Sequence, residues 1–233
     1  RSIPSPCAHA EPKALKKHGV ARIDPYLWMH ELESARMLAH LETENAYAKE
    51  VLRDNQPLEE ALYREMLARV QESDSSVPVR FGAWMYYSRT ERNQQYAIHC
   101  RKLVVDGKWH GSPEEILLDE NLEAAGKAHY EVGDYEISPS GRYLAWTEDT
   151  RGERSYRLRV RDLARGKGLR LSRRDVGSLC WGADDTHLFY TAEDQKTHRP
   201  RQLWLLDFNA SKDRLLFEER DERFNLLVSK TRS

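Results

Sequence analysis

A recurrence of about 45 residues constrains the fold of this chain more than any other feature of its sequence. Leu158–Leu163 and Leu203–Phe208 are equivalent segments, each with an acid at its fifth position, and the two acids lie 45 positions apart. Upstream of them, Ile137–Trp146 resembles Cys180–Tyr190, because in both a small polar turn precedes an aromatic-rich segment. A period of roughly 40–50 residues is typical of the four-stranded blade of a β-propeller.

Two further segments extend this pattern. Val79–Leu118 fits as an earlier copy of the unit, and Phe224–Ser229 is predicted to be the first strand of a fourth. A β-sandwich gives similar strand spacing, but the repeated order of turn, strand, loop and strand favours a propeller. Propellers protect their sheet edges by closing into a ring. We therefore expect residues 75–233 to form an incomplete propeller of about three blades that stops before closure.

The region before residue 74 has a helical period instead. Between Glu31 and about Ser73, apolar residues recur at steps of three and four, and Pro57 is suited to the first turn of a second helix. The two predicted faces contain Leu38, Leu41, Ala48 and Leu52, then Leu58, Leu62, Met66, Leu67 and Val70. The sequence therefore predicts a mainly β fold with an N-terminal helical segment, divided into residues 1–74 and 75–233.

Charge and cysteine content argue against several classes of function. The 37 basic and 38 acidic residues give a formal net charge of -1, so no long-range field favours nucleic acid or a membrane surface. Cys7, Cys100 and Cys180 have neither metal-ligand nor disulfide-framework spacing, which predicts idle thiols, no metal site and a reducing compartment. A cytoplasmic location is therefore expected, while the start at Arg1 rather than methionine leaves an exported form open.

Five motifs, in a fixed order, resemble those of one enzyme family. Arg22–Trp28 is similar to an R-x-D-x-Y-x-W segment, Leu41–Tyr47 to L-x-x-E-N-x-Y, and Glu115–Asn121 to E-x-L-L-D-x-N. Gly133–Pro139 and Glu148–Glu153 resemble the motifs of a second blade. Together they resemble the start of the prolyl oligopeptidase family of serine peptidases, in particular its oligopeptidase B members.

The resemblance implies a two-domain enzyme. In that family a seven-bladed propeller covers the active site of a C-terminal α/β-hydrolase domain, which packs on N-terminal helices and is missing from this chain. The propeller restricts cleavage to short peptides, and oligopeptidase B relatives cleave after Arg or Lys. Short basic peptides and the hydrolase domain of the same protein are thus the implied partners, and no cofactor is implied.

The catalytic residues are expected to lie outside this chain. A serine acyl-transfer enzyme of the α/β-hydrolase type carries its nucleophile in a G-x-S-x-G turn, and residues 1–233 contain no such sequence. The nine histidines form no recognisable set. We therefore assign no catalytic residue and no metal ligand.

One group of charges is a candidate for contact between domains. It contains Glu148, Asp149, Arg151, Glu153 and Arg154, which fall within seven residues between two predicted strands. A solvated hairpin loop is the simplest interpretation. The resemblance to the family's D-x-x-G-E motif favours a second one, in which these charges pair with the hydrolase domain and help to set open and closed states.

Two other functions stay open from the sequence. The chain could be a stand-alone propeller-type binding module, or an inactive or split relative whose hydrolase half is a separate chain. The coding sequence that follows residue 233, and the mass of the purified protein, distinguish these possibilities from a peptidase.

Overall fold

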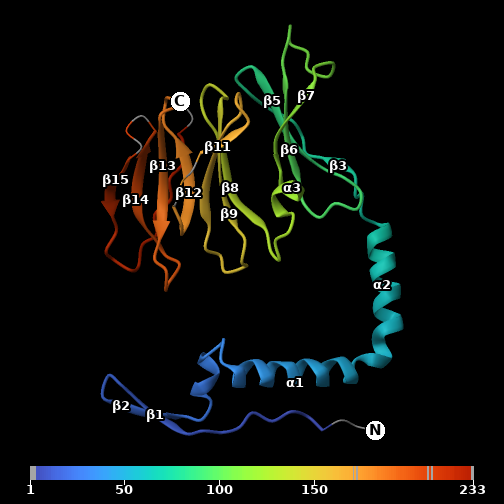
Figure 1. The fold of residues 1–233 in the computed structure, drawn as a ribbon, viewed down its shortest axis with the longest axis vertical. Helices are drawn as coiled ribbons and strands as arrows, with labels where there is room; N and C mark the ends of the chain where they lie inside the picture. The colour runs from blue at the N-terminus through green and yellow to red at the C-terminus, as the bar shows by residue number, and fades with distance from the viewer. Residues whose placement is uncertain (1–3, 170, 172, 209, 211, 232–233) are drawn as a thin grey trace. The chain divides into compact units, whose positions relative to one another are not determined.

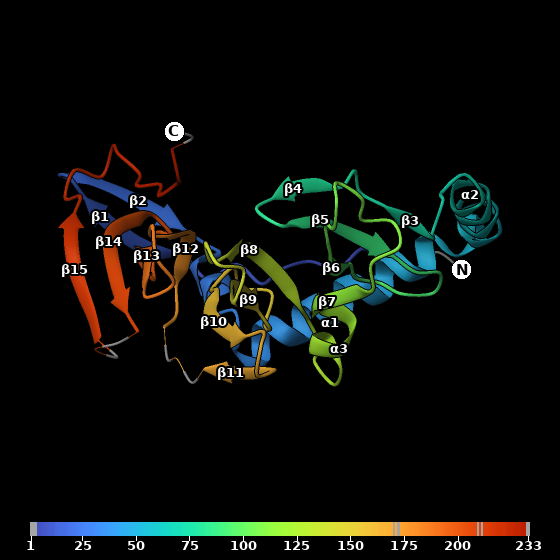
Figure 2. The same cartoon turned by 90° about the horizontal axis from the view of Figure 1, so that it is seen from above.

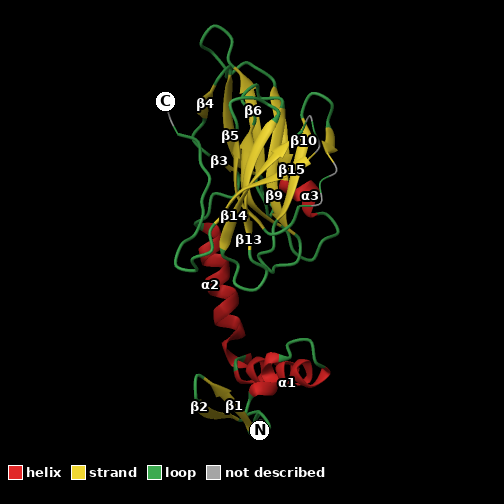
Figure 3. Cartoon of the chain, turned by 90° about the vertical axis from the view of Figure 1, so that its left-hand side faces the viewer, coloured by secondary structure: helices red, strands yellow, loops and turns green. Residues whose placement is uncertain are grey.

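A computed structural model describes residues 4–169, 171, 173–208, 210 and 212–231. The chain divides into two compact units, Arg1–Gln71 and Glu72–Ser233. Helices dominate the first unit and strands the second, in which α3 (Glu120–Ala124) is the helix among the described residues (Figure 3). We describe each unit separately.

The first unit consists of a hairpin followed by two α-helices. Its elements are β1 (Lys13–Lys17), β2 (Val20–Asp24), the 3-10 helix η1 (Leu27–His30), α1 (Ala35–Val51), the 3-10 helix η2 (Arg53–Asn55) and α2 (Gln56–Ala68). Ser34 caps α1, because its side chain accepts a hydrogen bond from the Met37 N–H at 3.2 Å. Pro57 lies in the first turn of α2, where its missing N–H costs no intrahelical bond. The predicted helical segment and its second start are therefore present.

The two α-helices leave their apolar side chains in contact with solvent. No residue of α1 or α2 is buried. Leu38 and Leu41 on α1 are 48% and 43% exposed, and Leu62 and Met66 on α2 are 48% and 67% exposed. Among the described residues, no helix combines the length and apolar character needed to cross a bilayer.

The second unit contains three antiparallel sheets, which follow one another in chain order (Figures 1 and 2). The first sheet contains β3 (Asp74–Ser75), β4 (Val79–Phe81), β5 (Trp84–Thr90), β6 (Ile98–Leu103) and β7 (Glu114–Asp119). The second contains β8 (Glu131–Ile137), β9 (Tyr143–Asp149), β10 (Arg157–Asp162) and β11 (Lys167–Leu169). The third contains β12 (Val176–Trp181), β13 (His187–Glu193), β14 (Pro200–Asp207) and β15 (Lys212–Glu218).

This topology confirms blades of a propeller rather than the layers of a sandwich. In the second and third sheets each strand pairs with the next along the chain, in the orders β8-β9-β10-β11 and β12-β13-β14-β15. The equivalent strands β10 and β14, which carry the 45-residue recurrence, belong to different sheets. Such repeated four-stranded meanders are the units of a propeller. We refer to the three sheets as blades one, two and three.

Hydrogen bonds join neighbouring blades and connect residues that lie 44 or 45 positions apart in the sequence. The Leu179 N–H donates to Asp134 Oδ2 at 3.0 Å, and Trp181 Nε1 donates to the Glu136 carbonyl at 3.1 Å; each bond spans 45 residues and joins β12 to β8. Between blades one and two, Arg161 Nη1 donates to the Leu117 carbonyl at 3.1 Å. The repeat is therefore visible in the contacts between blades as well as in their strands.

The apolar core lies between the blades. One buried cluster joins blades two and three and contains Ala145, Leu158, Val160, Val176, Leu179, Trp181, Leu188, Tyr190 and Leu206. A smaller one joins blades one and two and contains Leu117, Leu118, Leu144 and Trp146. Between blades two and three the rings of Tyr143, Trp181 and Phe208 also stack, with centroids 5.4–6.3 Å apart.

The prediction that Phe224–Ser229 forms the first strand of a fourth blade is wrong. These residues belong to no strand and follow a turn after β15. A strand exists through a ladder of backbone bonds to a neighbouring strand. Here the Leu226 N–H donates to the Pro200 carbonyl at 2.9 Å and the Val228 N–H to Ser178 Oγ at 3.0 Å. These isolated bonds hold the segment against blade three without forming a ladder.

We predict that replacing Leu188 by alanine in the full-length protein destabilises the propeller strongly. Leu188 is 0% exposed in the cluster between blades two and three, and a cavity there should cost about 2–5 kcal/mol. Leu122→Ala is the matched control, because Leu122 on α3 is 75% exposed and surface changes usually stay within about 0.5 kcal/mol. Thermal unfolding of both variants measures the difference, and equal midpoints would contradict the assigned core.

Candidate functional site

The five charges selected from the sequence lie at the hairpin between β9 and β10, where the structure divides them into two groups. Glu148 and Asp149 end β9 and are 2% and 1% exposed. Arg151, Glu153 and Arg154 lie in the connecting loop and are exposed. The five charges are therefore not one surface cluster. Two buried carboxylates lie at the end of β9, and three exposed charges lie in the loop that follows.

Glu148 is a buried carboxylate that pairs with two partly exposed cations. Its Oε1 accepts from Arg159 Nε at 2.7 Å and lies 2.6 Å from Arg159 Nη2, and its Oε2 lies 3.9 Å from Lys127 Nζ. A buried carboxylate needs such partners because an unpaired buried charge is strongly unfavourable. These contacts hold β9 to β10 and to the segment before β8.

Asp149 organises the loop through backbone hydrogen bonds. Its Oδ1 accepts from the N–H groups of Arg151 and Gly152 at 2.9 and 3.2 Å, and its Oδ2 accepts from Arg154 N–H at 2.7 Å. Burial of the carboxyl would raise its pKa, but these three hydrogen bonds outweigh burial and lower it. Asp149 is therefore a loop-shaping anion.

The exposed group carries the charges that a partner could contact. Arg151 Nη2 and Glu153 Oε2 form an ion pair at 2.8 Å, with side chains 58% and 55% exposed. Gly152 and Arg154 have φ angles of +75° and +56°, which bend the loop so tightly that three amides reach one carboxylate. Only the glycine adopts this conformation without steric cost. The loop thus presents one cation–anion pair and a second arginine on a fixed backbone.

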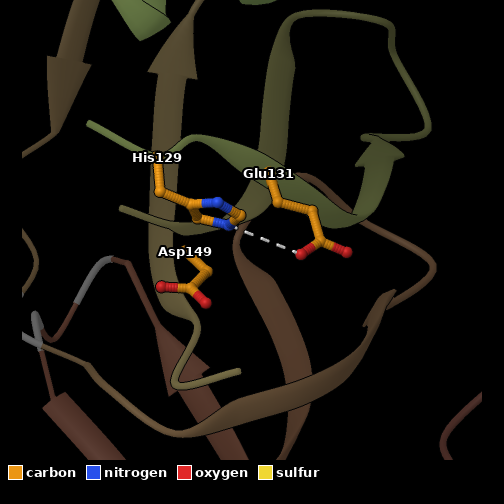
Figure 4. A group of neighbouring side chains, drawn as sticks. All are labelled: His129, Glu131 and Asp149. Carbon is orange, nitrogen blue, oxygen red and sulfur yellow. Dashed lines mark ion pairs between the residues drawn. The ribbon is translucent and has the colours of Figure 1, made fainter. Parts of the chain in front are cut away.

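The structure adds His129 and Glu131 to this region (Figure 4). One potential ligand atom from each of His129, Glu131 and Asp149 lies within 4.8 Å of the others, and His129 Nε2 is 3.7 Å from Glu131 Oε2. Sequence reasoning missed the trio because Asp149 is 18 positions beyond Glu131. The i, i+2 spacing of His129 and Glu131 was a usable signal, since alternate residues of an extended chain share a face.

Two serines of the β region, Ser140 in a turn and Ser178 in β12, have partners other than histidine. Ser140 Oγ donates to Asp185, whose Oδ1 also accepts from the Ser140 N–H at 3.1 Å, which joins blades two and three. Ser178 Oγ lies 3.1 Å from Thr191 Oγ1 and accepts from Val228 N–H. Both hydroxyls therefore have structural partners.

Comparison with known proteins relates most of the chain to one family. Residues 6–233 match the family model described as the prolyl oligopeptidase N-terminal β-propeller domain. The chain is 35% identical over 231 residues to dipeptidyl aminopeptidase BI of Pseudoxanthomonas mexicana, covering 92% of this chain and 32% of that protein. It is 33% identical over 234 residues to protease 2 of Moraxella lacunata, covering 98% of this chain and 34% of the relative.

Solved structures show the same fold. Oligopeptidase B from Leishmania major matches with a TM-score of 0.85 and 26% identity, covering 96% of this chain and 34% of the other. Oligopeptidase B from Trypanosoma brucei, in a closed form with covalently bound antipain, matches with a TM-score of 0.82 and 26% identity, covering 95% and 33%. The chain therefore spans about a third of the length of the relatives that it matches.

We predict that Asp149→Ala destabilises the protein by about 1–3 kcal/mol, because three loop amides lose a buried acceptor. Glu153→Gln is the matched control: Glu153 is exposed, and its single ion pair contributes about 0–1 kcal/mol. Thermal unfolding near pH 7 measures both variants.

The pH dependence of the same comparison tests the cause. A carboxyl group with a lowered folded pKa stabilises the protein above its unfolded value of 3.8, and this contribution disappears as the pH falls through the folded pKa. The difference between the parent protein and Asp149→Ala should therefore shrink as the pH falls below 3.8. A difference that is independent of pH would show that the charge of Asp149 does not stabilise the loop.

Proposed function

Because this chain belongs to the prolyl oligopeptidase family and forms part of its N-terminal propeller domain, we propose that it is the substrate-gating portion of a serine peptidase that cleaves short peptides. The observation that carries this proposal is the run of three sequential blades in the region that matches the family. A propeller over an active site admits short chains and excludes folded proteins.

Residues 1–74 are proposed to pack on the hydrolase domain of the same protein, and residues 75–233 to supply the first blades. The support is the apolar surface of α1 and α2, whose Leu38, Leu41, Leu62 and Met66 are all more than 40% exposed. Contiguous exposed apolar surface commonly marks an interaction site. Covering it with the hydrolase domain would remove these side chains from water.

The loop between β9 and β10 is proposed to pair with the hydrolase domain when the enzyme closes. The support is the difference in burial within the group. Glu148 and Asp149 are buried and hold the end of β9 in place, while Arg151, Glu153 and Arg154 are exposed and available to a partner. A single exposed ion pair contributes only about 0–1 kcal/mol. Several pairs acting together are thus needed to shift an equilibrium between open and closed states.

Cleavage after Arg or Lys is the finer part of the proposal. Its support is the likeness to two structures of oligopeptidase B and the order of the sequence motifs. We also place the protein in the cytoplasm, in keeping with the free thiols of Cys100 and Cys180, which are buried and unpaired with each other.

The test is hydrolysis of matched short peptides by the full-length protein. We expect turnover of substrates with Arg or Lys before the scissile bond, loss of turnover with a serine-directed inhibitor, and no turnover by residues 1–233 alone. Equal cleavage of peptides with proline or alanine at that position would contradict the basic preference. Activity that resists the inhibitor would contradict the serine mechanism.

The gating role predicts a charge-dependent change in the full-length enzyme. Glu153→Arg should change kcat/KM for short peptides by up to about fivefold, in line with about 1 kcal/mol per exposed pair. Arg165→Glu is the matched control, because Arg165 is a 73% exposed arginine at the opposite end of β10. The effect of Glu153→Arg should also weaken at high salt. Equal effects of the two substitutions on kcat/KM, or an effect of Glu153→Arg that does not depend on salt, would exclude a gating role for this loop.

A further inference from the structure

His129, Glu131 and Asp149 bring three metal-ligand types together from two parts of blade two. His129 and Glu131 lie at the entrance to β8, while Asp149 ends the neighbouring strand β9, opposite Glu131 in the ladder. Their ligand atoms lie within 4.8 Å of one another. Figure 4 shows the imidazole of His129 between Glu131, to which its ion pair is drawn, and Asp149, whose carboxylate lies on the other side of the ring.

The imidazole of His129 lies between these two acids without a hydrogen bond at one nitrogen. Nε2 is buried and has no hydrogen-bond partner, and its nearest acid, Glu131, is 3.7 Å away. A Cβ atom added to Gly152 would lie 3.5 Å from Cγ of the ring, so the loop backbone packs beside the imidazole. A buried polar atom without a partner is unusual and calls for a physical explanation.

The two carboxylates retain free acceptor capacity. An ionised carboxylate offers about four lone-pair positions, and Asp149 uses three of them for loop amides. Glu131 is half exposed, with 51% of its side chain in contact with solvent, and besides His129 it contacts the Tyr156 hydroxyl, which it would have to leave or share on binding an ion. The trio therefore provides one nitrogen and two anionic oxygens close to one another.

We propose that His129, Glu131 and Asp149 bind a divalent transition-metal ion, for which Zn²⁺ is the probe. Zn²⁺ takes histidine nitrogen and carboxylate oxygen at about 2.0–2.2 Å, which places neighbouring ligand atoms about 3.4 Å apart. The present spacing, up to 4.8 Å, requires the His129 and Glu131 side chains to move inward toward the fixed Asp149 carboxylate. Mg²⁺ and Ca²⁺ fit less well because they prefer sites made of six or more oxygens.

Such an ion would act on the loop between β9 and β10. Asp149 holds the backbone of Arg151, Gly152 and Arg154, so a metal bound to the same carboxylate would tie this loop to the start of β8. This regulatory consequence rests on the proposed gating role, whereas metal binding itself does not. The test therefore measures binding rather than peptidase activity.

The experiment titrates Zn²⁺ into the untagged full-length protein after treatment with a chelator, using calorimetry. The variants are His129→Gln and Glu131→Gln. His187→Gln is the matched control, because His187 also lies near two acids, with Nδ1 3.0 Å from Asp184 and Nε2 4.0 Å from Asp207. Each trio substitution should lower the affinity of one site by at least about tenfold, and the control should retain that site.

Thermal unfolding gives a second measurement. An ion that binds the folded state raises the unfolding midpoint, so Zn²⁺ should raise it more in the parent protein and His187→Gln than in Glu131→Gln. Because Glu131 is half exposed, this variant decides the question even if His129→Gln folds poorly. Unchanged titrations in both trio variants, or equal losses in the His187 control, would overturn the site and leave His129 and Glu131 as a simple ion pair.

Discussion

The burial of blade two on both faces, against blade one and against blade three, is the interaction on which the described β unit depends. Along β9, Leu144 and Trp146 enter the cluster shared with blade one, while Ala145 between them enters the cluster shared with blade three. A strand turns successive side chains to opposite faces, so one apolar run serves two interfaces. In β10 the apolar residues face blade three, and Arg161 reaches back to a carbonyl of blade one. Among the described residues no blade has a buried cluster of its own, and the bonds between blades accordingly join residues 44 or 45 positions apart.

This dependence explains which parts of the fold could be predicted from the sequence. Blades two and three were predictable because their repeated segments bury side chains with the same alternation, and α2 because Pro57 follows a helical stripe. Phe224–Ser229 resembles the first strand of a unit in composition, but pairing partners rather than composition make a strand. Its backbone bonds instead to Pro200 and Ser178, side by side with blade three, and no local sequence pattern encodes such contacts.

The candidate site was only partly predictable, for a related reason. The motif from Glu148 to Arg154 correctly located a charged hairpin, but a string of charges does not state which side chains are buried. Glu148 is buried because Arg159 on the next strand and Lys127 before β8 both reach it. His129 joins the region through the pairing of β8 with β9, which brings Glu131 opposite Asp149. Pairing between distant strands therefore decides which side chains meet at this site, and the local sequence around Asp149 does not contain His129 or Glu131.

The buried end of β9 and the exposed loop are coupled because the Asp149 carboxylate belongs to the strand and also binds the loop amides. Asp149 is held at the end of a core strand, and its oxygens fix the amides of the residues on either side of Glu153. The exposed charges are consequently attached to the blade with little freedom, which reduces the entropy that a partner must offset to engage them. The same arrangement makes the loop sensitive to whatever else contacts Asp149. A cation bound by His129, Glu131 and Asp149 would weaken the hydrogen bonds that the loop amides donate to the Asp149 carboxylate. Binding of the cation and the geometry of the exposed charges would therefore depend on each other.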